Sequence, residues 1–450
     1  MSTLTIAIVV AFVFGYLCIA LESLTKINKA AIALLMCVIC WTLLMMGPGA
    51  YYPDVAADGL LHHISEVIEH HLGDAAGTLF FLMGTLFFLM GAMTIVEIVD
   101  SNGGFNFVRD ALKTRSKRKL MWRVAFMTFF LSAILDNLTT SIVMIMVLRK
   151  LVQSREDRLI YAALIIISAN SGGAFSPIGD VTTIMLWIKG VITTQGVLTE
   201  IFIPSLVSMV VPAFILQYSL SGKFDKAQNL PKASVSQFTQ KQRNIIFWLG
   251  VGGLVFVPIF KTITHLPPFM GILLVLGVLW TVTEIFHYNT SEDDTMAKRV
   301  SDILSKIDLS TIMFFLGILM AVAVLQEIGV LTAMGEGLNE AFSGNYYLIN
   351  GIIGMLSSIV DNVPLVAGCM GMYPVAAEGA MAVDGIFWQL LAYCAGVGGS
   401  MLIIGSAAGV VVMGLEKITF GWYMKRITWI AFVGYLAGIL CYWVEQMLFF

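Results

Sequence analysis

An aspartate and an asparagine stand in the middle of an otherwise apolar stretch, at Asp136 and Asn137, and Thr139 and Thr140 follow them. A carboxylate, an amide and two hydroxyls offer oxygen atoms, which are the ligands that hard cations prefer. A carboxylate can also take up and release a proton. We therefore expect this stretch to bind a small polar species, and most simply a cation.

The same pair returns half a chain later as Asp361 and Asn362, 225 residues beyond the first pair. Several glycines repeat at an offset of 226, namely Gly91, Gly172, Gly173 and Gly179 with Gly317, Gly398, Gly399 and Gly405. The chain therefore contains an internal repeat. Duplicated membrane units with interrupted apolar segments are typical of secondary transporters, which bind their substrate where the interruptions meet.

The composition indicates a polytopic membrane protein, because 58% of the residues are hydrophobic and only 12% are charged. The six cysteines lie in or beside apolar runs, and we interpret them as core thiols and not as a metal site or disulfides. The first apolar run lacks a preceding basic segment and reads as a spanning helix, not as a signal peptide. No nucleotide-binding loop is present, so ion gradients would supply the energy. The chain is predicted to be a transporter and not an enzyme, without a nucleic-acid partner.

Charges beside the apolar runs predict which connections face the cytoplasm. Lys26 and Lys29 separate the first two runs, so we expect this connection to be cytoplasmic and the N-terminus external. The acidic connection 47–77 would be external, and an amphipathic helix at 105–112 would lie in the cytoplasmic interface. Spans are expected near 4–22, 28–46, 78–99, 200–221, 244–260, 268–287, 311–327 and 427–449.

The segment 120–148 is about 43 Å long as one straight helix, which exceeds one ordinary crossing. Basic clusters stand at both of its ends, so it is predicted to enter from the cytoplasm, turn near Asp136 and return. One long tilted helix is the alternative. The second pair lies between apolar arms that are also short, and no lysine or arginine occurs from Ile307 to Glu416. This second hairpin is therefore expected to enter from outside.

Two further segments, 159–190 and 387–414, are interrupted by glycines, and the first also by Pro177. A broken helix exposes backbone polar groups at membrane depth, which is tolerable where they line a site. Asp180 also has the position of a helix cap, so capping and ion binding remain alternatives for it. The predicted fold is all-α and polytopic, with ten crossings, both termini outside and two inverted-topology repeats, each with a re-entrant hairpin and a broken transmembrane helix.

We expect the following organisation along the chain. Residues 1–77 form scaffold helices and an external loop, 78–221 repeat 1, 222–243 a cytoplasmic linker, 244–310 further scaffold spans, and 311–450 repeat 2. The hairpins are predicted at about 120–150 and 346–372.

A carboxylate at the bilayer centre costs at least about 3 kcal/mol, so Asp136 and Asp361 need partners. No lysine or arginine lies near them in the sequence, which leaves a bound Na⁺ or a proton. A carboxylate that holds either ion, but not both, is an exchange device. The alternative is that both only cap turns. Further ligands are expected among Asn137, Thr139, Thr140, Asn170, Ser171, Asp180, Asn362, Ser400, Ser406 and the backbone carbonyls of the breaks.

The motifs Asp136-Asn-Leu-Thr-Thr and Asp361-Asn-Val-Pro, with the two glycine-rich breaks, resemble the NhaD-type Na⁺/H⁺ antiporters of the ion transporter superfamily over about 75–425. The resemblance implies exchange of Na⁺ or Li⁺ for H⁺ at alkaline pH in a bacterial inner membrane, without a cofactor. It also implies a homodimer whose transport part moves as an elevator. Related dicarboxylate symporters carry serine at the hairpin tips, and aspartate there disfavours an anionic substrate.

Two other functions remain open, a carrier of organic anions or metalloid oxyanions on the same scaffold and a passive channel. Glu97, near Asp100 at the inner end of its span, could relay protons or could simply be hydrated. Four histidines flank Glu66 and could form a metal site, a pH sensor or a solvated face. They are His62, His63, His70 and His71.

Overall fold

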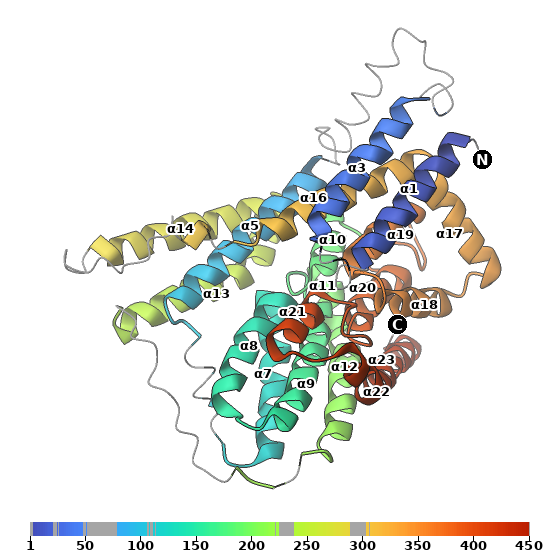
Figure 1. Ribbon diagram of the computed structural model, residues 1–450. Helices are drawn as coiled ribbons and strands as arrows, with labels where there is room; N and C mark the ends of the chain where they lie inside the picture. The colour runs from blue at the N-terminus through green and yellow to red at the C-terminus, as the bar shows by residue number, and fades with distance from the viewer. Residues whose placement is uncertain are drawn as a thin grey trace.

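The computed structural model describes residues 3–20, 25, 27–47, 51, 79–105, 108, 111–112, 114–220, 222–224, 238–288, 303–305 and 307–449. The secondary structure of these residues is helical, and Figure 1 shows the helices in two groups. The histidine cluster of the acidic loop and most of the predicted cytoplasmic linker lie outside the described residues.

The upper group in Figure 1 consists of long helices that pack along one another. It contains α1 (Thr3–Ala20), α3 (Lys29–Met45), α5 (Leu79–Ser101), α13 (Gln240–Thr264), α14 (Pro268–Tyr288), α16 (Leu309–Glu327) and the shorter α17 (Val330–Ala341). Helix α3 packs most closely against α16 and α1, and α14 packs against α13 and α5. The long members of the group are apolar over nearly their whole length, except for the polar start of α13, as lipid contact requires.

The lower group contains more and shorter helices. It comprises α7 (Lys117–Leu135), α8 (Asn137–Leu151), α9 (Arg155–Ala174), α11 (Thr194–Glu200), α12 (Phe202–Leu216), α18 (Tyr346–Ser357), α20 (Ile386–Gly398), α21 (Ala407–Glu416), α22 (Phe420–Arg426) and α23 (Thr428–Phe449). Two helices, α10 (Val181–Lys189) and α19 (Asn362–Met372), lie where the two groups meet (Figure 1).

Five helices of the described residues are long and apolar enough to cross a membrane, and the bent pair α11 and α12 would make a sixth. The chain is thus a multi-pass membrane protein. Six further apolar helices have 10–17 residues, among them α18, α19, α20 and α21. Such short helices match the predicted hairpin arms and half-helices, while the full count of ten crossings stays a prediction.

Each predicted hairpin position is occupied by two helices that double back. Lys117 at the start of α7 forms a 2.6 Å ion pair with Asp157 in the first turn of α9, so α7 begins at the end where α8 finishes. In the second pair, Tyr346 at the start of α18 and Tyr373 just after α19 both pack on Phe387. The ring centroids lie 5.8 and 4.5 Å apart. The turns therefore fall near Asp136 and Asp361, as the sequence predicts.

Both predicted breaks are present, between α9 and α10 and between α20 and α21. Glycines are required there because backbones approach closely. A Cβ added to Gly179 would lie 2.8 Å from the carbonyl oxygen of Ser132, and one added to Gly405 would meet the carbonyl of Ser358. Any larger residue would push the hairpin tip away from the break.

One local expectation is wrong. Phe105, Val108 and Leu112 are buried in the protein, and the ring of Phe105 packs edge-on against Phe247 of α13 at 6.0 Å. These three side chains, which the sequence predicts to face the lipid interface, are covered by protein instead, and Phe105 by Phe247 of α13. Periodicity shows that a helix has an apolar face, but it does not distinguish lipid from protein as the surface that covers it.

Candidate functional site

Four helix N-termini meet at one small cavity of about 50 Å³. The first residues of α8, α10, α19 and α21 line it, with Asn137, Val181, Asn362 and Ala407 at the four starts. A volume of this size exceeds the roughly 10–15 Å³ that one water needs, so the cavity can hold a cation with little of its hydration shell. The four helices are the two return arms of the hairpins and the two second halves of the broken helices.

Three of these helices are capped by an aspartate that lines the cavity, Asp136, Asp180 and Asp361. In each case Oδ1 accepts a backbone N–H of the first turn, at distances of 2.7, 3.3 and 3.4 Å in that order. In each carboxylate, Oδ1 therefore caps the helix, and Oδ2 contacts another partner. Capping and ion binding, which the sequence offered as alternatives, are compatible in this geometry.

Asp180 is the centre of the site, since both hairpin tips converge on its Oδ2. The side-chain amide of Asn137 donates to that oxygen at 3.2 Å, and the amide of Asn362 donates to it at 3.1 Å. All three residues are at most 5% exposed. One buried carboxylate oxygen therefore holds together two segments that are 225 residues apart.

Asn170 extends this network into the second break. Its side-chain oxygen accepts from Asn137 at 3.1 Å, and its Nδ2 donates to the Oγ of Ser406 at 3.0 Å. Ser406 in turn caps α21 by accepting the backbone N–H of Gly409 at 3.2 Å. The predicted residues Asn137, Asn170, Asp180 and Ser406 thus form one hydrogen-bonded chain.

Asp136 is held differently from the other two carboxylates. Its Oδ2 accepts the hydroxyl of Thr139 at 2.9 Å, and its backbone has φ of 78°. A positive φ is uncommon outside glycine, asparagine and aspartate, so it restricts which residues fit at the tip of the first hairpin. The predicted ligand Thr139 therefore supports Asp136.

Other predicted site residues point elsewhere. The hydroxyl of Ser171 accepts from Ser208 of α12 at 2.8 Å, and the hydroxyl of Ser400 donates to the carbonyl of Val397 at 2.6 Å. Thr140 is buried, and its hydroxyl has no hydrogen-bond partner in the described part of the chain. Glu97 accepts the hydroxyl of Ser101 at 2.9 Å. None of these four lines the cavity.

The same hydrogen bond occurs in both halves of the chain. Ser132 donates to the carbonyl of Ala169 at 2.6 Å, and Ser357 donates to the carbonyl of Ala395 at 2.7 Å. Each bond fixes the first arm of a hairpin to the half-helix before a break. The internal repeat read from the sequence thus has a counterpart in matched contacts.

The expectation that no basic residue lies near the paired aspartates is wrong. The Nζ of Lys29, in the first residue of α3, lies 2.9 Å from the Oδ2 of Asp361. It also lies 4.3 Å from the ring centroid of Phe314 in α16. The lysine and the aspartate are 332 residues apart in the chain, so no local pattern could have paired them.

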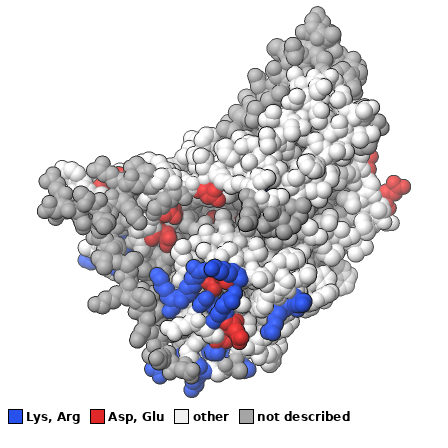
Figure 2. All heavy atoms as spheres, in the orientation of Figure 1, with Lys and Arg blue, Asp and Glu red and all other residues white. Residues whose placement is uncertain are grey.

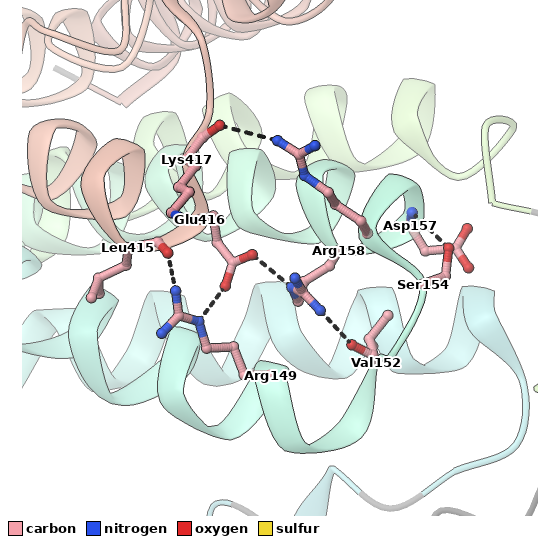
Figure 3. Close-up of polar contacts among 9 residues, drawn as sticks. Arg149, Val152, Ser154, Asp157, Arg158, Leu415, Glu416 and Lys417 are labelled. Atoms are coloured by element: carbon pink, nitrogen blue, oxygen red, sulfur yellow. Dashed lines mark hydrogen bonds and ion pairs between the residues drawn. The ribbon is translucent and has the colours of Figure 1, made fainter.

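A second buried carboxylate lies far from the cavity. Figure 3 shows Glu416, at the end of α21, between the guanidinium groups of Arg149 and Arg158, each 2.6 Å from one of its oxygens. Arg149 also donates to the carbonyl of Leu415. The cluster ties α21 to α8 and α9 where basic side chains gather on the lower face in Figure 2. No motif in the sequence distinguishes Glu416.

Among the described residues, no group of three His, Cys, Asp or Glu side chains is arranged to hold a resident metal ion. The cavity therefore differs from a structural metal centre.

Comparison with known proteins identifies the family. A family model described as "Citrate transporter" matches residues 16–391. Sodium/proton antiporter 1 of Arabidopsis thaliana is 45% identical over 446 residues, with 99% of this chain and 73% of the relative covered. Sodium/proton antiporter 2 of the same plant is 41% identical, with 96% and 97% covered. The Na⁺/H⁺ antiporter NhaD of Alkalimonas amylolytica is 29% identical, with 97% and 90% covered.

The chain belongs to the NhaD-type Na⁺/H⁺ antiporter family. The resemblance inferred from the two Asp-Asn motifs and the glycine-rich breaks is thereby confirmed. Members of the NhaD-type family are transporters and not enzymes, and they need no cofactor because Na⁺ and H⁺ are the transported ions.

Proposed function

We propose that this protein exchanges cytoplasmic Na⁺ or Li⁺ for external H⁺, with both ions competing for the carboxylates of the cavity. The observation that carries the proposal is Asp180, which is 2% exposed and accepts hydrogen bonds from neutral amides. In the described residues it has no ion-pair partner. A buried charge without a counter-ion is costly, so a cation or a proton stabilises it.

Asp136 and Asp361 complete the site in this proposal. Both line the same cavity as Asp180, so a cation bound there interacts with all three carboxylates. A proton on any of them weakens this attraction and favours release of the cation. Competition of this kind couples the two ions without a covalent step.

We further propose that the two repeats are related by inverted topology and that the hairpins are re-entrant from opposite faces. The matched serine bonds and the doubling back of both helix pairs support this arrangement. The upper group would then be the scaffold of a homodimer, and the lower group, with α10 and α19, the part that moves as an elevator. This assignment refines the organisation expected from the sequence.

The sidedness follows from the charge rule. Basic residues at the start of α7, the end of α8 and the start of α9 support a cytoplasmic open end for the first hairpin, and in this proposal both termini lie outside. Lys29 and Thr311, at the starts of α3 and α16, line the cavity, so it would be reached from the cytoplasm. A bacterial plasma membrane is one location, and the Arabidopsis relatives show that the family also occurs in plants.

An organic-anion carrier is the second candidate, because helix N-termini attract anions and the matching family model is described as "Citrate transporter". The three carboxylates that line the cavity count against it, since they would repel a carboxylate substrate at close range. They also fill the positions next to the helix amides where an anion would bind.

Reconstituted proteoliposomes with an internal pH-sensitive dye separate these functions. We expect Na⁺ or Li⁺ added outside to drive proton movement that saturates, and citrate or choline chloride to have no effect. Proton movement that requires an organic acid and not Na⁺ would favour the anion carrier. Currents that follow voltage without saturating counter-transport would favour a channel.

A further inference from the structure

Lys29 and the three cavity aspartates share one space, although the lysine belongs to the upper group of helices and Asp361 to a hairpin tip. The ion pair is accessible to water, because the two side chains are 23% and 16% exposed. Its ammonium lies next to Oδ2 of Asp361. Because Oδ1 accepts the backbone N–H of Val363, a Na⁺ bound to Asp361 would use that same Oδ2. Two cations cannot both neutralise one carboxylate oxygen in so small a cavity.

The charge balance of the cavity also indicates that Lys29 and a bound Na⁺ exclude each other. A helix N-terminus carries about half a positive charge, so four of them bring roughly two positive charges to face three carboxylates. The ammonium of Lys29 supplies a third and makes the cavity close to neutral. A further cation then enters favourably only if the ammonium withdraws.

Phe314 provides a place to which the ammonium can withdraw. The ring belongs to α16, is buried, and its centroid lies 4.3 Å from Nζ, which is within the range of a cation–π contact. The ring and Lys29 both belong to the upper group, whereas Asp361 caps α19. The lysine can therefore leave the carboxylate without becoming a buried charge that lacks any partner.

We propose that the ammonium of Lys29 is a tethered cation that competes with Na⁺ for Asp361 and thereby sets the apparent Na⁺ affinity. The inference rests on the proposed Na⁺/H⁺ exchange and adds a residue that determines its affinity. The function of Lys29 is to neutralise Asp361 when Na⁺ is absent and to be displaced when Na⁺ binds.

The test compares Na⁺ binding and transport by the full-length protein and three variants. Lys29→Met removes the charge and keeps the length of the side chain, and Lys29→Arg keeps the charge. Lys261→Met is the matched control, since Lys261 also contacts a ring, that of Trp187 at 4.3 Å, and donates to a carbonyl. The measurements are binding of ²²Na⁺ to purified protein and the Na⁺ concentration at half-maximal transport in proteoliposomes.

We expect Lys29→Met to lower the half-saturating Na⁺ concentration about fivefold or more. In the parent, only the molecules in which Lys29 has left Asp361 can bind Na⁺, and the apparent affinity is reduced in proportion to their fraction. Lys29→Arg, which keeps the charge, should not lower the half-saturating Na⁺ concentration, and Lys261→Met should stay close to the parent. An unchanged value for Lys29→Met would overturn the proposal. A raised value would also overturn it, since it would mean that the ion pair stabilises the Na⁺-binding conformation. A parent that neither binds nor responds to Na⁺ and Li⁺ would instead reject the exchange function itself.

Discussion

Replacing Asp180 by asparagine tests the role of the residue on which both hairpin tips converge. The asparagine can still accept the backbone N–H of Thr182 through its side-chain oxygen, so the cap of α10 survives. Its NH₂ group would then face the amides of Asn137 and Asn362, which are themselves donors. The variant therefore removes the charge and breaks the hydrogen bonds that join the two tips.

The size of the effect follows from the dimensions of the cavity. An ion in a space of about 50 Å³ lies close to the carboxylates that line it. At about 4 Å, two unit charges interact by roughly 4 kcal/mol at an effective dielectric constant of about 20. The positive helix ends offset part of this attraction. Each factor of ten in affinity corresponds to about 1.4 kcal/mol, so we expect the half-saturating Na⁺ concentration of the variant to rise at least about a hundredfold.

The assay is Na⁺-dependent proton movement in proteoliposomes over a wide range of Na⁺ concentration, with the amount of folded protein checked by size-exclusion chromatography. Asp384→Asn is the control. Its carboxylate accepts from Thr193 and Gln389, outside the cavity, so Na⁺ affinity should not change. If folded Asp180→Asn kept a half-saturating concentration within about threefold of the parent, Asp180 would be only a helix cap and this reasoning would be refuted.

Three other changes have defined outcomes. Asn362→Ala leaves Asp180 with one of its two amide donors, and we expect a tenfold or greater weakening of Na⁺ affinity from a charged hydrogen bond worth about 1.5–3 kcal/mol, measured by ²²Na⁺ binding. Glu416→Gln removes the charge between two arginines and should lower the free energy of unfolding of the purified protein by about 2–4 kcal/mol, measured by thermal denaturation. Gly405→Ala places a methyl group against a backbone carbonyl and should abolish transport, while Gly252→Ala, which has open space, should not.

For each of these three expectations there is a result that would contradict it. Asp157→Asn breaks a partly exposed ion pair with Lys117 and should cost much less than Glu416→Gln, so equal losses would mean that the arginine pair has no special role. Full transport by Gly405→Ala would show that the backbone of the second break can move apart. Unaltered Na⁺ affinity in Asn362→Ala would leave the second hairpin tip without a role in binding.

The local sequence was sufficient to predict where the helices end and where they are interrupted. The turns at Asp136 and Asp361 and the breaks before Asp180 and Ser406 were predictable, because caps, glycines and prolines act within a few residues. The repeat offset then placed the two halves in register. These features also define which polar residues reach the cavity from each helix start.

Partners distant in the chain were not predictable from the same patterns. Lys29 read as part of a cytoplasmic connection, yet its side chain reaches a hairpin tip that lies near the other end of the chain. Ser171 and Ser400 sit in the right motifs but face α12 and their own helix turn. Side-chain direction depends on how whole helices pack, which a single sequence does not specify.

The most direct test of the account is whether Na⁺ binding releases protons from the purified protein. Na⁺ would be added to the protein in a weakly buffered detergent solution at alkaline pH, with choline chloride as the control and an indicator dye as the reporter. The account predicts saturable acidification by Na⁺ and Li⁺ that is lost when Asp136, Asp180 and Asp361 are all replaced by asparagine. Binding of ²²Na⁺ without any proton release, over the whole pH range in which the protein is folded, would contradict it.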